Sequence, residues 1–196
     1  MCEMDDLGGF AQSGMTRRRF GALTLGAGVG SMISLGLPRV ALAVDTKGRD
    51  LDIKTPAGTC DAYFVHPEQG KHPAVLIWPD IFGLREAFKG MATRLAQSGY
   101  TVLVVNPFYR ARRAPTSAPG ADLKDPAVRE ALMEMRKALT PEAAAVDAKA
   151  LVGFLDKQAA TDTKRKVGTM GYCMGGPLVM RTAAAWPRTS PTARTC

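Results

Sequence analysis

One cysteine of this sequence, Cys173, stands between glycines at a spacing that suits nucleophilic chemistry. It lies in the run Gly171-Tyr172-Cys173-Met174-Gly175-Gly176, which has the form Gly-x-nucleophile-x-Gly. In a nucleophile elbow, the central residue occupies a strained turn between a strand and a helix, so that its side chain stands clear of the sheet. Glycines flank such a turn because a Cβ there would collide with the neighbouring strand and helix. The pattern predicts that the Cys173 thiolate attacks a carbonyl carbon and that the Met174 backbone N–H stabilises the oxyanion.

A cysteine nucleophile of this kind also needs a histidine to carry a proton and an acid to orient that histidine. In enzymes built around such an elbow, both residues follow the nucleophile in the chain. The stretch from Met174 to Cys196 contains no Asp, Glu or His. The two histidines of the chain, His66 and His72, lie upstream, and we interpret them as surface residues.

Several interpretations of Cys173 therefore remain open. It is either the nucleophile of a hydrolase or a buried structural cysteine in a glycine-rich turn. The chain is alternatively an inactive truncated fragment, or a non-catalytic binding protein of the same fold. A redox thiol protein is a weaker alternative, because Cys60, a conceivable resolving cysteine, is distant in the sequence.

The segments around the elbow predict strands that alternate with helices. Strands are expected at residues 51–55, 59–65, 73–78, 101–105 and 166–171. Helices are expected between residues 84 and 99, at 127–139, from 141 onward with Thr140 as the cap, and at 177–185. The first two strands form a hairpin, whereas 73–78 and 101–105 are continuous apolar runs typical of strands buried on both faces. This order predicts an α/β fold with a doubly wound, mostly parallel sheet and helices on both faces.

Three segments resemble the dienelactone hydrolase (carboxymethylenebutenolidase) family of the α/β-hydrolase superfamily. The elbow is similar to the family pattern G-[FY]-C-x-G-G, and Asp80-Ile81-Phe82-Gly83-Leu84 is similar to E-I-F-G-V. Residues 106–110 resemble the family's P-D-L-Y stretch. The similarity runs from about residue 50 to residue 186. It implies an α/β-hydrolase fold whose C-terminal strands and helices are missing from this chain.

The resemblance implies roles for particular residues. The backbone N–H of Ile81 corresponds to the second oxyanion donor. Asp80 stands where the family has a glutamate that helps to switch the nucleophile between thiol and thiolate. Arg110 and Arg112 bracket the arginine that holds a substrate carboxylate, and the choice between them stays open. The implied function is hydrolysis of esters or lactones of small carboxylate-bearing substrates through an acyl-enzyme, without a metal or an organic cofactor.

Residues 1–43 predict an export signal of the twin-arginine type. Arg17 and Arg18 precede Phe20 and a glycine-rich apolar run, and Ala41-Leu42-Ala43 forms a small-x-small cleavage site. A transmembrane anchor is disfavoured, because the apolar run is shorter than the roughly 20 residues that a span requires. We expect an exported protein, periplasmic or secreted, that meets the twin-arginine machinery and keeps no stable membrane anchor. Met15 is an alternative start, since the residues before it add nothing to the signal.

Residues 44–187 are expected to form a partial α/β-hydrolase domain, and residues 188–196 an aberrant tail. The hydrophobic pattern stops after Pro187. Together with the missing acid and base, this change suggests a frameshift or a premature stop near Trp186. The sheet would then end on an exposed strand of the buried type, which is an aggregation hazard.

Composition narrows the classes of function. The chain has 196 residues, of which 46% are hydrophobic and 22% charged, as in ordinary soluble domains. The formal net charge is +8, but the basic residues are scattered and form no stripe interleaved with aromatic residues. This distribution argues against nucleic-acid binding. The four cysteines have neither zinc-site nor Cys-x-x-Cys spacing, so neither a metal site nor a disulfide framework is expected.

Overall fold

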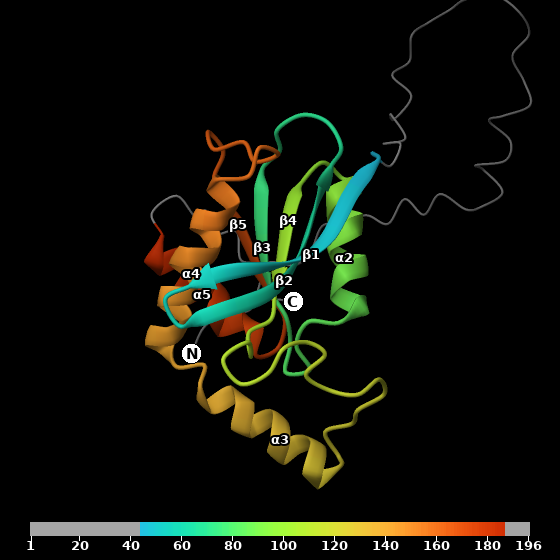
Figure 1. Cartoon of the computed structure of the whole chain (residues 1–196), viewed down its shortest axis with the longest axis vertical. Coiled ribbons are helices and arrows are strands. Elements are labelled where there is room, and N and C mark those ends of the chain that lie inside the picture. Colours follow the sequence, from blue (N-terminus) through green and yellow to red (C-terminus); the bar gives the residue numbers. More distant parts are fainter. Residues whose placement is uncertain (1–43, 187–196) are drawn as a thin grey trace, which may run out of the picture. The chain divides into compact units, whose positions relative to one another are not determined.

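The computed structural model describes residues 44–186. The export signal predicted at residues 1–43 and the tail predicted at residues 188–196 lie outside these described residues. Within them the chain forms the following elements: β1 (Thr46–Thr55), β2 (Gly58–Pro67), β3 (Ala74–Trp78), α2 (Glu86–Gln97), β4 (Thr101–Val105), α3 (Pro126–Lys137), α4 (Pro141–Asp156), β5 (Gly168–Gly171) and α5 (Gly175–Ala185) (Figure 1).

The strands form one sheet in the order β1-β2-β4-β3-β5. β3 lies between β4 and β5 and pairs in parallel with both. β1 and β2 form the expected hairpin, and β2 joins the parallel part by pairing antiparallel with β4. All five residues of β3 and of β4 are buried, as expected for strands that are covered on both faces. The predicted α/β architecture with a mostly parallel core is confirmed.

Helices cover both faces of the sheet. α2 packs on one face, and α4 and α5 pack on the other (Figure 1). Side chains of β4 alternate between the two layers, because successive residues of a strand point to opposite faces. Val102 and Val104 pack with Phe88 of α2, whereas Leu103 packs with Leu151 of α4. All described residues belong to one compact unit.

Helix α3 lies beyond the end of the sheet (Figure 1). Its one buried residue, Leu132, packs against Ile81 and Phe108. These two residues follow β3 and β4 in the chain. The helix thus covers the carboxyl ends of the parallel strands, where ligands bind in open α/β sheets.

Helix boundaries agree with the sequence where a local capping signal exists. Thr140 caps α4 by accepting a hydrogen bond from the Ala143 N–H at 3.2 Å, as predicted. α3 begins at Pro126, because Asp125 caps it. The helix predicted from Leu84 begins instead at Glu86. Leu84 is buried with the α2 layer but precedes the helix.

No described helix is both long and apolar enough to cross a membrane. β5 pairs with β3 along one of its edges. Within residues 44–186 no strand pairs with its other edge.

Candidate functional site

Cys173 occupies a strained turn between β5 and α5. Its φ angle is 51°, and it is the one non-glycine residue among residues 44–186 with a positive φ. Side chains with a Cβ rarely adopt this left-handed conformation, and such strain gathers at functional sites. Two short hydrogen bonds close the turn, from Gly175 N–H to the Tyr172 oxygen at 2.8 Å and from Gly176 N–H to the Cys173 oxygen at 3.0 Å. The Cys173 side chain is exposed, so the geometry expected of an elbow is present.

Two of the three glycines around Cys173 are required by close packing. A Cβ on Gly171 would collide with the carbonyl group of Gly175. A Cβ on Gly175 would lie 2.8 Å from the carbonyl oxygen of Pro79 and closer still to that of Trp78. Gly176 has no atom within 4 Å of its Cβ position. The start of α5 therefore sits directly on the backbone that leaves β3.

The two predicted oxyanion donors come from these two adjoining segments. Ile81 follows β3, and Met174 precedes α5. Both side chains pack in one cluster with Phe108. In the described part of the chain, neither the Ile81 N–H nor the Met174 N–H donates a hydrogen bond.

Asp80 is bound to its own turn. Its carboxylate accepts two hydrogen bonds from the Arg85 guanidinium, at 2.6 and 2.8 Å. It also accepts the Phe82 N–H at 3.0 Å. No hydrogen bond from another described residue reaches the Cys173 thiol. The predicted partnership of Asp80 with Cys173 is therefore not formed as a hydrogen bond in this structure.

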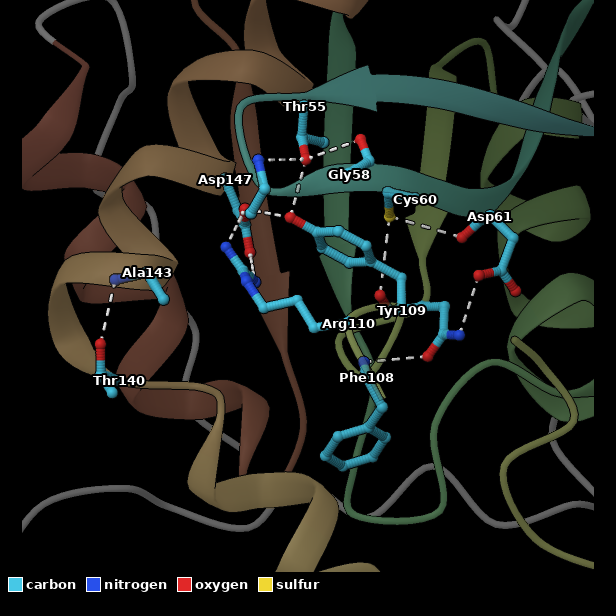
Figure 2. Close-up of polar contacts among 12 residues, drawn as sticks. Thr55, Gly58, Cys60, Asp61, Phe108, Tyr109, Arg110, Thr140, Ala143 and Asp147 are labelled. Carbon is cyan, nitrogen blue, oxygen red and sulfur yellow. Dashed lines mark hydrogen bonds and ion pairs between the residues drawn. The ribbon is translucent and has the colours of Figure 1, made fainter. Parts of the chain in front are cut away.

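Arg110 is bound to a buried carboxylate. It donates two hydrogen bonds to Asp147, at 2.6 and 2.8 Å, and Asp147 is only 1% exposed. The Tyr109 hydroxyl donates to the same carboxylate at 2.7 Å and lies 2.8 Å from the Thr55 hydroxyl (Figure 2). Burial raises the pKa of Tyr109, and its bond to Asp147 acts in the same direction. The hydrogen bonds from Arg110 to Asp147 raise the pKa of Arg110.

Asp147 is not among the residues predicted from the sequence, although a signal for its pairing is present in α4. The residue lies on the apolar face that Ala144, Ala148 and Leu151 form along α4. An acid on such a face has to be paired, because burying an isolated charge is costly. The position could therefore have predicted a buried cationic partner, but not which one.

Arg112 differs from Arg110 in its surroundings. It is exposed, and its side chain forms no ion pair with any residue of the described range. Its carbonyl oxygen accepts a hydrogen bond from the Asn106 side chain at 2.8 Å, which fixes the backbone there. Arg112 borders a cavity of about 540 Å³ that Leu132 of α3 also lines. Leu132 belongs to the cluster that contains Ile81, but no residue of the elbow lines this cavity.

A larger cavity, of about 950 Å³, lies between the β1–β2 hairpin, the start of α2 and the loop at residues 113–121. No residue of the elbow lines it. Most of its charged side chains are engaged in ion pairs, for example Lys89 with Asp50 and Arg113 with Asp52. Neither of the two described cysteines and neither histidine borders this larger cavity.

The other described cysteine and the two histidines lie apart from the elbow. Cys60 is fully buried, and burial raises the pKa of its thiol, with further contributions from the Asp61 and Asp147 carboxylates. His66 and His72 bond to nearby backbone carbonyl oxygens, at 2.6 and 2.7 Å. Among residues 44–186, no group of three His, Cys, Asp or Glu side chains could hold a metal ion.

This chain is similar in sequence to proteins of one known family. The family model described as "Dienelactone hydrolase family" matches residues 60–194. A carboxymethylenebutenolidase of Rhodococcus opacus is 28% identical over 136 residues, which cover 68% of this chain and 48% of that protein. One from Pseudomonas putida is 31% identical over 118 residues, or 60% of this chain and 48% of that protein. The chain spans about half the length of these curated relatives.

Solved structures show the same fold. A dienelactone hydrolase-like promiscuous phosphotriesterase from metagenomic libraries has a TM-score of 0.55 at 24% identity, covering 70% of this chain and 54% of that one. A cold-adapted esterase from an Arctic intertidal metagenomic library has a TM-score of 0.52 at 18% identity, covering 74% and 55%. The sheet is thus that of the α/β-hydrolase fold. Because the family model matches well over half of the sequence, the chain belongs to the dienelactone hydrolase family.

Proposed function

We propose that this chain provides the nucleophile of a cysteine hydrolase that opens esters or lactones of small carboxylate-bearing substrates. The observation that carries the proposal is the exposed Cys173 at a φ of 51°. The positive φ, the close-packed glycines and the start of α5 reproduce a nucleophile elbow. Family membership and the names of the relatives support the same reaction class.

The proposed reaction begins when the Cys173 thiolate attacks the substrate carbonyl carbon. The carbonyl oxygen becomes an oxyanion, which the N–H groups of Met174 and Ile81 stabilise. The carbon–oxygen bond to the leaving group then breaks, and the leaving oxygen takes up a proton, which leaves a thioester on Cys173. Water cleaves the thioester, releases the acid and restores the thiol.

Acylation is the step on which the residues of this chain can be tested. Neither described histidine bonds to the elbow. An ester with a good leaving group needs no proton from the protein when that group departs. Acylation by such an ester therefore measures the reactivity of Cys173 without the general base on which full turnover depends.

We expect 4-nitrophenyl acetate to acylate Cys173 roughly ten- to a hundredfold faster than it acylates a simple thiol, because oxyanion donors contribute about that much or more. The measurement is the release of nitrophenolate from the full chain, followed by mass analysis of its peptides. Cys60 serves as an internal control, since its buried, protonated thiol should stay unmodified. If Cys173→Ala releases nitrophenolate as fast as the wild type, the proposal is wrong. It is also wrong if Cys60 and Cys173 are labelled equally. Equal labelling would favour the alternative of an inert fragment or binding protein.

We propose further that Arg112, and not Arg110, holds the carboxylate of the substrate, because Arg110 already binds Asp147. Arg112→Met should slow acylation by a carboxylate-bearing 4-nitrophenyl ester about tenfold, or about 1.4 kcal/mol, which is near the low end for hydrogen bonds to charged groups. Acylation by the neutral acetate ester should not change. Arg113→Met is the matched control, because Arg113 pairs with the exposed Asp52. Equal slowing of both esters in Arg112→Met would argue against this role.

A further inference from the structure

The turn after β3 is built around Asp80. Its side chain accepts the Phe82 N–H at 3.0 Å, and its carbonyl oxygen accepts the Gly83 N–H at 2.9 Å. Both bonds span Ile81, which lies between the donor and acceptor residues. Gly83 has a φ of 72°, in the left-handed region that favours glycine. A Cβ on Gly83 would collide with the hydroxyl of Thr116. The path of the backbone on both sides of Ile81 is therefore closely defined.

Arg85 ties this turn to α2. Besides its two hydrogen bonds to Asp80, its guanidinium donates to the Gly83 carbonyl oxygen at 3.2 Å. The same guanidinium lies 5.6 Å from the ring centroid of Phe82 and 4.9 Å from that of Phe88. Bidentate arginine–carboxylate pairs restrict geometry more than single hydrogen bonds do. One side chain thus joins the carboxylate, the backbone and an aromatic ring of the turn to the helix that follows.

The position of Arg85 in α2 makes this arrangement unusual. Arg85 is the N-cap residue of the helix and makes no side-chain capping bond. Helices prefer Ser, Thr, Asp or Asn at this position, and a positive charge opposes the helix dipole there. An arginine at the N-cap therefore weakens the start of α2. Arg85 instead stabilises the structure through its bonds to Asp80 and Gly83 and its contacts with two aromatic rings.

The loop after β4 also holds the turn. The hydroxyls of Thr116 and Ser117 both lie within hydrogen-bonding distance of the Phe82 carbonyl oxygen, at 3.0 and 3.4 Å. Ile81 itself is 5% exposed and packs in the cluster that Met174 of the elbow adjoins. The Asp80 carbonyl oxygen and both polar backbone groups of Phe82 are hydrogen-bonded, whereas the Ile81 N–H donates to no described residue.

We propose that Asp80 and Arg85 form a clamp that holds the Ile81 N–H in place as an oxyanion donor. Both are then positioning residues, and neither exchanges a proton with Cys173. The inference rests on the proposed function and deepens it. A preorganised donor stabilises the transition state because the protein need not rearrange during the reaction. Releasing the clamp should lower oxyanion stabilisation while the nucleophile stays intact.

Two reagents separate a positioning role from a proton-transfer role. Acylation by 4-nitrophenyl acetate develops an oxyanion on a carbonyl oxygen, so its rate depends on the position of the donors. Alkylation by iodoacetamide displaces iodide at a saturated carbon and develops no such oxyanion. Its rate reports the thiolate fraction and the accessibility of Cys173. The ratio of the two rate constants therefore measures oxyanion stabilisation alone.

We expect Arg85→Met to lower the acylation rate constant of the full chain at least about tenfold, since losing a whole donor costs about 10²–10³ in rate. Alkylation of Cys173 and the pH midpoint of that alkylation should be unchanged. Asp80→Asn should behave like Arg85→Met. The control is Arg94→Met, an exposed arginine of the same helix, which should leave both rates unchanged.

Three results would overturn the clamp. One is an unchanged acylation rate in Arg85→Met, and another is an equal loss in both reactions. The third is a shift in the pH midpoint of alkylation in Asp80→Asn alone, which would assign Asp80 to proton transfer. Amide hydrogen exchange of residues 80–85 should accelerate in Arg85→Met even if the protein is not acylated. If wild-type Cys173 is acylated no faster than a simple thiol, the hydrolase proposal and the oxyanion role both fail. The rate of amide hydrogen exchange at residues 80–85 then still decides whether Arg85 holds the turn.

Discussion

Gly175→Ala is expected to destabilise the protein by about 3 kcal/mol or more, at the upper end of the usual cost of overpacking. The new Cβ would collide with the carbonyl groups of Trp78 and Pro79. Backbone atoms cannot turn away as a side chain can, so α5 has to move off β3. The expected loss is a large fraction of the free energy of unfolding of a domain, which is about 5–15 kcal/mol. Urea unfolding followed by far-ultraviolet circular dichroism measures the effect.

Gly176→Ala is the matched control, because it makes the same chemical change one residue along the same helix. Nothing lies within 4 Å of its Cβ position. Alanine also has a better helix propensity than glycine, so stability should stay within about 1 kcal/mol of the wild type or rise slightly. Equal losses in the two variants would mean that the close contact between α5 and β3 does not exist. The contact between α5 and β3 also positions the turn that contains Cys173, so Gly175→Ala should slow acylation as well.

Arg110→Met is expected to destabilise the protein by about 3–5 kcal/mol, which is the usual cost of removing one partner of a buried ion pair. Asp147 is 1% exposed and would keep the Tyr109 hydroxyl but lose both hydrogen bonds from the guanidinium. The uncompensated charge in α4, and not the lost attraction itself, is the main source of the loss. Chemical unfolding midpoints of the purified variants measure it.

A second substitution tests this explanation. Adding Asp147→Leu to Arg110→Met removes the unpaired charge, so the double variant should recover much of the lost stability. Arg113→Met breaks the pair between Arg113 and Asp52, whose side chains are 64% and 50% exposed. That variant should show little change in stability, because solvent screens exposed pairs. If Arg110→Met is as mild as Arg113→Met, Arg110 is not the partner of a buried charge.

Local patterns in the chain were enough to predict most of the strands and helices. The apolar runs became the buried strands β3 and β4, and the cap at Thr140 became the start of α4. The glycine spacing around Cys173 predicted the strained turn between β5 and α5. These features depend on residues that are at most a few positions apart, so their patterns are visible in the chain. One error followed from the same logic, because Leu84 continues the helical spacing of α2 but lies outside the helix.

The tertiary structure alone decided how the candidate residues are paired. Arg110 and Arg112 look alike in the sequence, yet only Arg110 meets the buried Asp147, which is 37 residues away. The resemblance gave Asp80 a role in switching the thiol, and the structure shows that its carboxylate binds Arg85. The chemical roles of these residues stay predictions for the experiments above. Their partners could not be predicted because distant residues meet only when the helices have packed on the sheet, and several pairings satisfy the same charges until then.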